Sequence, residues 1–377
     1  MYGVQKGTIL YMGNFELPDK NAAAHRVMNN GKIFRKLGYR VVYLGTVHGE
    51  SFDGIRVSDY DENIFEEAYP TTTKAWVKHI FDTDNIEAVA KRFDDVRMVI
   101  AYNTPYATFR AIKKAFRNTS VAVAYDCTEW NSYAEGSLPK RLYKQLDEYQ
   151  IRNLLPKKCR DIIVISKMME EKYKGCNLLR LPPLVDINDP IWHQERDNHP
   201  DTFEFCFAGT INNKERLDSV VQAFCETENP ALRLRIIGLS KDEYIEAYPE
   251  QKELVSKDDR LLFMGYVSHE ESVKYVLSCD CYIFIRENNR RNEAGFPTKF
   301  AEAYTCGVPI ISTDVSDIKQ YADKGRVIII TDTSTETIKR TIITAVGKRK
   351  ISSHNLSDSF DYKNYVSETE AWISRIR

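Results

Sequence analysis

A lysine in the first turn of a predicted helix is the residue of this chain that most suggests chemistry. Residues 293–309 read Glu-Ala-Gly-Phe-Pro-Thr-Lys-Phe-Ala-Glu-Ala-Tyr-Thr-Cys-Gly-Val-Pro. We predict a helix that begins at Pro297, where the missing N–H is harmless, and ends before Gly307, which tolerates the left-handed conformation. Lys299 then lies where the helix dipole disfavours positive charge. Because a bound anion would reverse that penalty, the segment predicts a phosphate site.

Glu302 extends this site, because it lies three residues after Lys299 on the same helix face. Its carboxylate could accept hydrogen bonds from sugar hydroxyls that lie beyond a phosphate. The alternative is a solvated ion pair between the two side chains. We therefore assign Pro297, Thr298, Lys299 and Glu302 to a binding site for a nucleotide diphosphate.

Other candidates follow predicted strands, because ligands of open α/β sheets bind at the carboxyl ends of the strands. The strand Phe203–Gly209 ends in a glycine, whose lack of a side chain lets the backbone approach a ligand. Lys214 and Arg216 come next; either could hold phosphate, and either could be a solvated helix residue. Arg286 follows a buried strand, and its guanidinium could clamp a phosphate through two hydrogen bonds.

The first half of the chain offers candidates for the acceptor side of a site, where a second substrate would bind. Asp126, Glu129 and Trp130 follow the predicted strand 121–126 and could orient a sugar by hydrogen bonding and stacking. Among them we name Asp126 as a candidate catalytic residue. His25 lies after the loop that follows the first strand, and it is either an acceptor-side residue or a structural histidine.

Strand-like and helical runs alternate along the chain, which indicates α/β architecture with parallel sheets. We predict two Rossmann-like domains, residues 1–190 and 200–355, with a helix in 360–377 that packs back on the first. Residues 181–200, rich in Pro, Asp and Asn, are interpreted as the linker. The predicted strands cover residues 8–15, 40–45, 97–102, 121–126, 161–166, 203–209, 232–238, 261–265, 280–286, 308–313 and 327–331.

Composition excludes several classes of protein. The 377 residues carry a formal net charge of −1, which argues against a nucleic-acid binder. No apolar run is long enough to span a bilayer, and the first residues lack the pattern of a signal peptide. Eight cysteines occur singly, which suggests neither zinc nor a redox dithiol but free thiols in a cytoplasmic enzyme.

A basic helix is predicted within Lys140–Arg160. Leu142, Leu146, Tyr149 and Leu154 share one stripe of it, and basic residues occupy the other faces. One interpretation is peripheral contact with an anionic membrane at the inner face of the plasma membrane. The pattern favours the alternative, a helix that faces the core with its stripe and leaves its basic face in water.

The segment 293–309 closely resembles the donor-site motif of retaining GT-B glycosyltransferases, especially glycosyltransferase family 4. The second half of the motif is kept as Glu302-Ala-Tyr-Thr-Cys-Gly-Val-Pro309, whereas Ala294 stands where the first glutamate is expected. The run Phe-Pro-Thr-Lys-Phe-x-Glu, preceded by an Arg-rich segment, is similar to a subset of bacterial polysaccharide-type members.

The resemblance implies a GT-B fold, in which two Rossmann-like domains with parallel sheets face a central cleft. It also implies retention of anomeric configuration and no metal or cofactor. The Gly265-Tyr266 loop would lie near the nucleobase. The family's Gly-Gly pair near the first helix is replaced here by Ala22-Ala23-Ala24. Asp59-Tyr-Asp61 matches a metal-binding triplet of the other large glycosyltransferase fold, but it lies in an acidic, loop-like stretch and we expect no metal there.

We therefore predict a glycosyltransferase that moves a sugar from a nucleotide-sugar, with a UDP-sugar favoured, to a glycan or glycolipid acceptor. Lys299 would offset the charge of the leaving diphosphate. Two alternatives stay open at this point. One is a sugar-nucleotide epimerase with the same fold, and the other is a non-catalytic GT-B subunit that binds a partner transferase.

Overall fold

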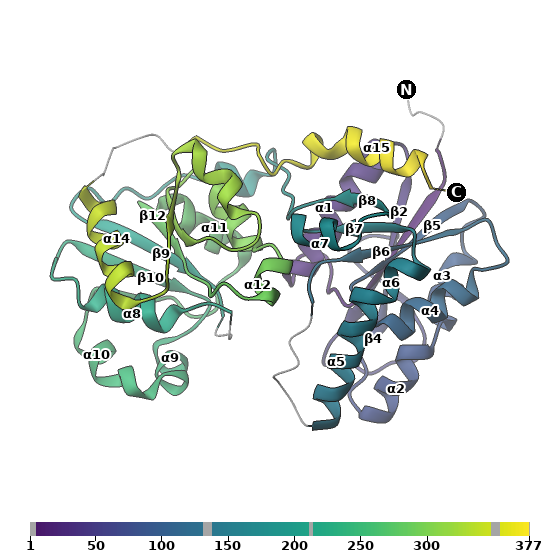
Figure 1. The fold of residues 1–377 in the computed structure, drawn as a ribbon, viewed down its shortest axis with the longest axis horizontal. Coiled ribbons are helices and arrows are strands. Elements are labelled where there is room, and N and C mark those ends of the chain that lie inside the picture. The colour runs from purple at the N-terminus through teal and green to yellow at the C-terminus, as the bar shows by residue number, and fades with distance from the viewer. Residues whose placement is uncertain (1–4, 131–137, 211–213, 348–354, 377) are drawn as a thin grey trace. The chain divides into compact units, whose positions relative to one another are not determined.

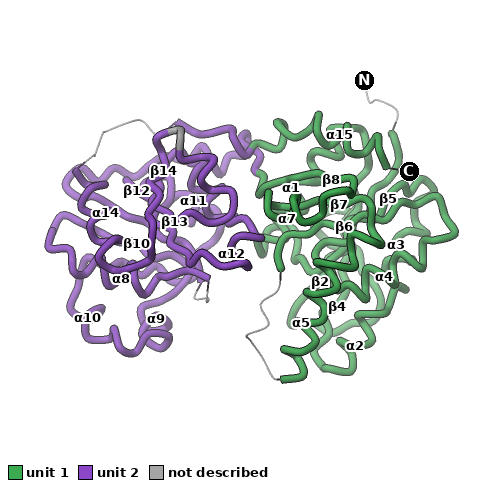
Figure 2. The backbone as a smooth tube through the Cα atoms, in the orientation of Figure 1, with its two compact units in different colours: residues 1–184, 361–377 green, residues 185–360 purple. Residues whose placement is uncertain are grey.

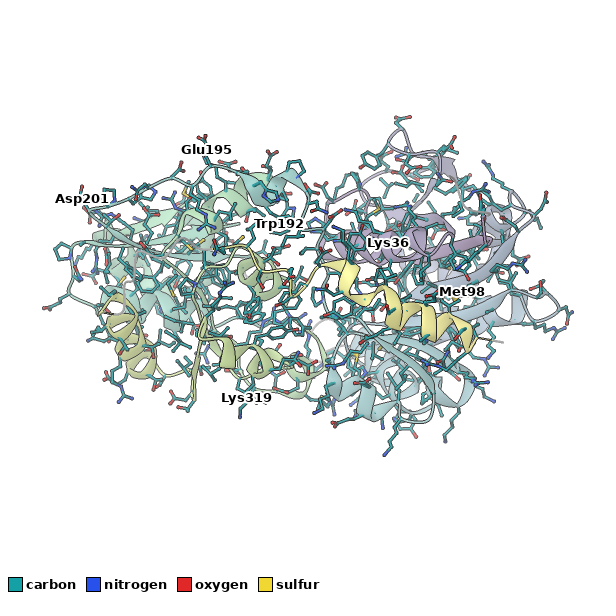
Figure 3. All side chains as sticks on the ribbon, turned by 90° about the horizontal axis from the view of Figure 1, so that it is seen from above. Lys36, Met98, Trp192, Glu195, Asp201 and Lys319 are labelled. Atoms are coloured by element: carbon teal, nitrogen blue, oxygen red, sulfur yellow. The ribbon has the colours of Figure 1, made fainter. Side chains whose placement is uncertain are left out.

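The computed structural model describes residues 5–130, 138–210, 214–347 and 355–376. The chain divides into two compact units, shown in different colours in Figure 2. Unit 1 comprises residues 1–184 and 361–377, and unit 2 comprises residues 185–360. The division thus follows Leu184, within the stretch of prolines and polar residues that we interpreted as a linker. In that stretch, Trp192 of the short helix η1 (Pro190–His193) is buried and is labelled in Figure 3.

Unit 1 is built on an eight-stranded sheet with the order β3-β4-β2-β1-β5-β6-β7-β8. Only β3 and β4 pair in the antiparallel sense among these strands; the other pairs are parallel. The strands are β1 (Thr8–Gly13), β2 (Arg40–Val47), β3 (Arg56–Val57), β4 (Ile64–Ala68), β5 (Val96–Tyr102), β6 (Ala122–Cys127), β7 (Asp161–Val164) and β8 (Asn177–Arg180).

Helices cover both faces of this sheet (Figure 1). The reason is that the strands after β1 are added toward one edge of the sheet, and those from β5 onward are added toward the other edge. The helix α1 lies on one face together with α15, and α4 lies on the other. The helices of unit 1 are α1 (Ala22–Lys36), α2 (Thr73–Phe81), α3 (Asp84–Ala90), α4 (Tyr106–Ala115), α5 (Leu138–Asn153), α6 (Leu155–Lys158), α7 (Lys167–Lys172), η4 (Tyr362–Tyr365) and α15 (Val366–Ser374).

Local chemistry explains how α1 is fixed on the sheet. The side chain of Asn21 caps the helix by accepting a hydrogen bond of 2.9 Å from the N–H of Ala24. Gly31 in the helix interior lies against the hydroxyl of Tyr43, and a Cβ at this glycine would come within 1.8 Å of that oxygen. A glycine that would weaken an isolated helix is therefore required here by close packing.

Residues 361–377 complete unit 1. Trp372 of α15 is fully buried, and its indole N–H donates to the carbonyl oxygen of Asn177 at 3.0 Å. Arg375 donates to the Asn177 side chain at 2.7 Å. This helix therefore belongs to the core of unit 1, together with side chains such as Met98 of β5, which is labelled in Figure 3.

Unit 2 is built on a six-stranded parallel sheet with the order β11-β10-β9-β12-β13-β14. Its core gathers Phe205, Ile236 and Ile283 from three neighbouring strands. The strands are β9 (Phe203–Ala208), β10 (Leu232–Ile237), β11 (Leu261–Phe263), β12 (Cys281–Phe284), β13 (Ile310–Thr313) and β14 (Val327–Ile330). The helices are η1, α8 (Leu217–Cys225), α9 (Lys241–Ala247), η2 (Pro249–Gln251), α10 (Lys252–Lys257), α11 (His269–Ser278), α12 (Arg290–Ala294), α13 (Thr298–Thr305), η3 (Ile318–Lys324) and α14 (Thr335–Gly347).

The structure confirms the predicted α/β class and every predicted strand, with ends that differ by a few residues. It also corrects three predictions. The stretch 58–67 is not only loop, because β4 begins at Ile64 despite its two glutamates, and β8 was not foreseen. The helix within 140–160 does not turn its apolar stripe to the core, since Leu142, Leu146 and Tyr149 are exposed while its acidic residues are buried. The eight cysteines are free, and most are buried.

Candidate functional site

Glycines at three neighbouring strand ends form a backbone platform in unit 2. Gly209 follows β9, Gly238 follows β10 and Gly265 follows β11, and the N–H of Gly238 donates to the oxygen of Gly265 at 2.9 Å. Gly238 has φ 99° and Gly265 has φ 65°, a backbone region that side chains disfavour. A Cβ at Gly238 would also lie 2.6 Å from the carbonyl oxygen of Gly209. The platform therefore requires glycine for both conformation and space.

Lys299 of α13 lies directly against this platform. A Cβ on Gly209 would come within 2.0 Å of the lysine nitrogen, Nζ. The same Nζ lies 5.6 Å from the centre of the Phe207 ring, within range of a cation–π interaction. The absence of a side chain at Gly209 thus leaves room for the ammonium group at the end of the central strand.

A buried carboxylate, which sequence reasoning missed, holds two cations together at this site. The Oε1 atom of Glu215 accepts hydrogen bonds from Arg286 at 2.5 and 3.2 Å, and it lies 3.8 Å from the Nζ of Lys299. The Glu215 side chain is 2% exposed, whereas Arg286 is 12% and Lys299 is 27% exposed. The cations therefore keep surface that a ligand can reach, while their shared counter-ion does not.

The environment of Lys299 favours an anionic ligand. Burial lowers the pKa of Lys299 below its usual value, because the charged form loses water; Glu215 opposes this, and Arg286 and Lys214 add to it. An ammonium ion that is partly dehydrated and near other cations gains from a phosphate more than a solvated lysine does. The site is thus electrostatically suited to an anion.

The sequence left open whether Lys214 or Arg216 would hold phosphate. Arg216 is already bound to two acids, Asp218 at 3.0 Å and Glu287 at 2.7 Å, and these partners raise its pKa. Its backbone N–H donates to the oxygen of Ile285 at 2.9 Å, which ties the loop to the end of β12. Arg216 therefore has a structural role, and Lys214 is the better candidate of the two.

The helix α13 differs from the prediction in one detail. Pro297, with ψ 116°, precedes the helix as its N-cap, and Thr298 is the first helical residue. Lys299 still lies in the first turn. Gly307 has φ 75°, as the sequence predicted for the residue that ends the helix.

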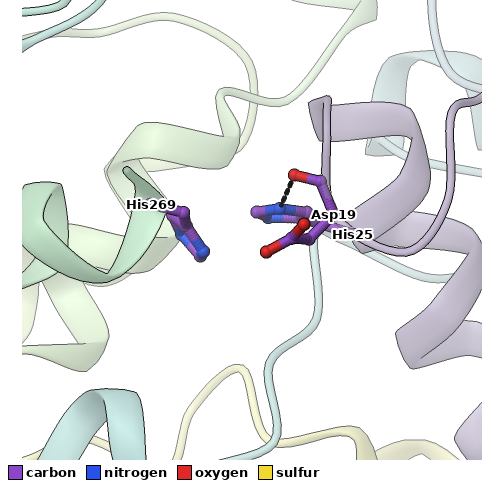
Figure 4. Close-up of side chains that lie close together, drawn as sticks. All are labelled: Asp19, His25 and His269. Carbon is purple, nitrogen blue, oxygen red and sulfur yellow. Dashed lines mark hydrogen bonds between the residues drawn. The ribbon is translucent and has the colours of Figure 1, made fainter. Parts of the chain in front are cut away.

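Glu302 has a partner that the sequence did not predict. The Nε2 atom of His269, the first residue of α11 and one of the side chains drawn in Figure 4, lies 3.3 Å from Oε1 of Glu302. Glu302 is 22% exposed. In the adjacent loop Tyr266, at 87% exposure, is the most exposed of the large apolar and aromatic side chains among the described residues. The carboxylate and this ring are available on the surface of unit 2.

In unit 1 the structure contradicts the role assigned to Asp126. Its carboxylate has no exposed surface and is bonded to the hydroxyl of Tyr11, to Asn30 and to Arg26, whose Nη2 lies 2.8 Å away. Arg26 in turn donates to the oxygen of Leu181 at 2.9 Å. Because all of these groups are enclosed, Asp126 cannot touch an acceptor, and it is a structural residue.

The remaining candidate residues of unit 1 are Trp130, His25 and Glu129. Trp130 is 3% exposed, and its N–H donates to the hydroxyl of Tyr173 at 3.2 Å, so the prediction that it stacks on a sugar is wrong. His25 is half-buried, and its Nε2 lies 3.0 Å from the carbonyl oxygen of Asp19 (Figure 4). Glu129 is half-buried as well. Neither His25 nor Glu129 gains an assigned role from these contacts.

In the Asp59-Tyr-Asp61 triplet, Asp61 has a local structural role. The side chain of Asp61 accepts hydrogen bonds from the backbone and the side chain of Asn63, at 2.8 and 3.0 Å. This arrangement caps the turn that joins β3 to β4. Asp61 therefore stabilises this turn.

Comparisons with known proteins agree with this architecture. Residues 188–365 match the family model described as "Glycosyl transferases group 1". HepE from Anabaena, solved in complex with UDP and glucose, has a similar structure with a TM-score of 0.68 at 13% identity, covering 98% of this chain and 100% of HepE. Sucrose-phosphate synthase from Thermosynechococcus elongatus gives 0.70 at 12% identity, covering 98% of each chain. No curated protein matches the sequence.

A putative UDP-N-acetylglucosamine 2-epimerase from Listeria monocytogenes also has a similar structure, with a TM-score of 0.58 at 12% identity over 98% of this chain and 96% of that one. The fold is therefore the two-domain α/β fold of GT-B glycosyltransferases. The matched residues, 188–365, include the platform, Glu215, Arg286 and Lys299.

Proposed function

We propose that this protein transfers a sugar from a nucleotide-sugar to a glycan or lipid-linked acceptor, with retention of configuration and without a metal ion. The observation that carries the proposal is the pair of partly exposed cations, Arg286 and Lys299, held on the buried Glu215 beside a platform of glycines. This arrangement suits a diphosphate, because a nucleotide diphosphate carries negative charge close to where its sugar bond breaks.

Cleavage of the bond between sugar and diphosphate leaves negative charge on the leaving group. Lys299 and Arg286 offset this charge as it develops, which is the task that a metal ion performs in other transferases. Glu215 keeps both cations in place before the donor binds, so little reorganisation accompanies the reaction. Lys214 is assigned to the same diphosphate.

Attack from the face that the leaving group occupies explains retention without a protein nucleophile. In this scheme an oxygen of the leaving diphosphate accepts the proton of the acceptor hydroxyl. The enclosed position of Asp126 fits the scheme, because it removes the one carboxylate that we had named for catalysis. Glu302 is proposed to bind the ribose hydroxyls, and the loop of Gly265 and Tyr266 the base.

The first test is binding of nucleotides by the purified chain. UDP, GDP, ADP, CMP and dTDP are compared by thermal shift, with and without EDTA. A ligand at a hundred times its Kd stabilises the folded protein by about 2.7 kcal/mol, which is easily detected. We expect UDP to give the largest shift and EDTA to leave it unchanged. Loss of the shift in EDTA and its rescue by Mg²⁺ would contradict metal independence.

A pair of glycine variants ties this binding to the site. Gly209→Ala places a methyl group where the Lys299 ammonium lies, and the flexible lysine must move while its charge is kept. Gly347→Ala, at the end of α14 with open space around it, is the matched control. We expect the first variant to weaken UDP binding about tenfold and the second to leave it unchanged. Equal binding by both variants would argue against the assigned position of the diphosphate.

Product analysis separates transfer from the alternatives. Incubation with a sugar nucleotide and candidate acceptors is expected to give a glycoside whose anomeric configuration is that of the donor. An epimerised sugar nucleotide formed without any acceptor would instead identify an epimerase. Binding of a diphosphate without turnover of any donor would identify a non-catalytic partner subunit.

A further inference from the structure

The helix α5 presents an apolar stripe to solvent. Leu138, Leu142, Leu146 and Tyr149 follow one another at spacings of four, four and three residues, so they share one face of the helix. Their exposed fractions are 68%, 58%, 55% and 59%. A surface helix of a soluble domain ordinarily turns such a stripe to the core.

The opposite face of α5 buries acids. Asp147 is 6% exposed and accepts a hydrogen bond of 2.8 Å from the N–H of Tyr106, at the start of α4. Glu148 is 4% exposed and lies 3.5 Å from Arg152. The helix is therefore oriented against its own amphipathic pattern: acidic groups lie inside and leucines lie outside. This orientation is reasonable where something apolar covers the outer face.

The helix α2 extends the apolar surface. It lies beside α5 in Figure 1, and the rings of Trp76 and Tyr143 join the two helices with their centres 4.9 Å apart. Val77 and Phe81, one turn apart on α2, are 48% and 64% exposed. Most of the exposed large apolar and aromatic side chains of the described residues are thus on these two helices.

The charge around this apolar surface is mainly positive. Every exposed charged residue between 138 and 160 is basic, because the two acids are the buried ones. A groove of about 1370 Å³ between α4 and α6 adjoins the end of α5, and Phe81 of α2 lies at its edge. Two acids, Glu87 and Asp161, line this groove together with seven bases: Arg110, Lys113, Lys114, Arg117, Lys157, Lys158 and Arg160.

We propose that unit 1 docks on an anionic lipid bilayer, with the apolar stripe of α5 and the end of α2 in the interface and the basic groove on lipid phosphates. Leucines flanked by lysines and arginines on a short helix are the composition of helices that lie in the plane of a membrane. Basic residues near an anionic leaflet add to this attraction. Within the described ranges no helix is long and apolar enough to cross a membrane, so the contact is peripheral.

A membrane accounts for the surface better than a protein partner does. The bases extend from α4 through α6, and all seven that line the groove are exposed. An array of phosphate headgroups matches such a spread of like charge, and the acyl boundary beneath them matches the adjacent leucines. None of these residues belongs to the diphosphate site, so docking stands apart from transfer chemistry.

The test is cosedimentation of the full chain with vesicles. Phosphatidylcholine vesicles and vesicles of phosphatidylcholine with phosphatidylglycerol are compared at low and at high salt. We expect at low salt about tenfold more protein on the anionic vesicles, and a loss of most of this excess at high salt, because the headgroup attraction is screened. Equal retention on both kinds of vesicle, or none on either, would overturn the proposal.

Paired variants separate the two parts of the surface. Leu142→Ser with Leu146→Ser removes the stripe, and Lys157→Glu with Lys158→Glu reverses charge at the groove; each pair is expected to lower retention about tenfold. Ile343→Ser on α14 of unit 2, where the side chain is 54% exposed, is the matched control and should bind like the wild type. UDP binding should be unchanged in all variants.

Two results would identify other roles. Wild-type binding to anionic vesicles by the variant with Leu142→Ser and Leu146→Ser would overturn the assignment of α5 to the membrane interface. The wild type could instead sediment as a dimer and not bind vesicles, while the variant with Leu142→Ser and Leu146→Ser sediments as a monomer. That result would show that the stripe covers a second copy of this chain. Because UDP binding is measured on the same samples, failure of docking is distinguishable from failure of the donor site.

Discussion

Unit 1 and unit 2 each place a buried carboxylate beside a basic side chain near the carboxyl ends of parallel strands, but the two clusters differ in exposure. In unit 1, Asp126 and its partner Arg26 are both enclosed, with side chains 0% and 4% exposed. In unit 2, Glu215 is equally buried, but Arg286 and Lys299 keep 12% and 27% of their side-chain surface.

This difference decides which cluster can bind a ligand. The groups around Asp126 use their hydrogen bonds on one another, and Arg26 also holds the chain at Leu181. The groups around Glu215 present their positive side outward, toward a backbone made of glycines. A buried acid with enclosed partners fixes the fold, whereas a buried acid with accessible partners positions charge for another molecule.

The largest expected effect tests the structural role of the cluster in unit 1. Arg26→Met leaves the Asp126 carboxylate buried without its cation, which we expect to lower the free energy of unfolding by about 3–5 kcal/mol. The measurement is urea denaturation followed by circular dichroism.

The double variant Arg26→Met with Asp126→Asn removes both charges and is expected to recover a large part of the loss. A single variant with a loss below about 1 kcal/mol would mean that the pair contributes little to the fold of unit 1.

The next effect tests the role of the cluster in unit 2. Lys299→Met keeps the length of the side chain but removes the charge, so we expect transfer to slow by about 10²–10³-fold. Stability should change little, because Arg286 still pairs with Glu215. The measurement is the initial rate of donor consumption with an acceptor.

Lys36→Met is the matched control, because this exposed lysine ends α1 in unit 1 and is labelled in Figure 3. Its rate should equal that of the wild type. A wild-type rate for Lys299→Met with every tested donor would refute the charge-neutralising role.

The smallest effect concerns another buried acid, Asp147 of α5, whose carboxylate accepts a hydrogen bond from the backbone N–H of Tyr106. Burial raises its pKa from 3.8 to about 6. The folded state therefore binds the proton more tightly than the unfolded state does. Stability from this group is present below pH of about 4 and is lost as pH rises toward 6, by about 3 kcal/mol at most.

Asp147→Asn keeps an acceptor for the N–H of Tyr106 but does not titrate. We expect this variant to lack the decline in unfolding free energy over that range of pH and to be more stable than the wild type at neutral pH. Parallel pH profiles for the two proteins would show that Asp147 does not titrate in this way.

Much of the candidate site in unit 2 could be predicted because its parts are local. Gly307 and Pro309 mark the end of a short helix. Lys299 in its first turn attracts notice because the helix dipole disfavours positive charge there. Glu215 was missed because its role arises only where the chain pairs with Arg286, 71 residues further on. Nothing in the sequence around residue 215 marks a carboxylate that will be buried between two cations.

The errors in unit 1 have a common physical origin. Periodicity tells which residues of a helix share a face, as with Leu142 and Leu146, but it does not tell which face is turned inward. A position at a strand end likewise does not tell whether a side chain such as Asp126 or Trp130 turns toward solvent or into the core. Tertiary packing decides both.

The path of the chain through the units also has a consequence for its synthesis. Unit 2 is made as one continuous stretch, residues 185–360, and can complete its sheet as it leaves the ribosome. Unit 1 begins first but still lacks Trp372, whose indole fills its core, until all of unit 2 has been translated. The domain that starts earliest is therefore the last to mature, and until then its nascent form must persist with an open site where α15 will pack.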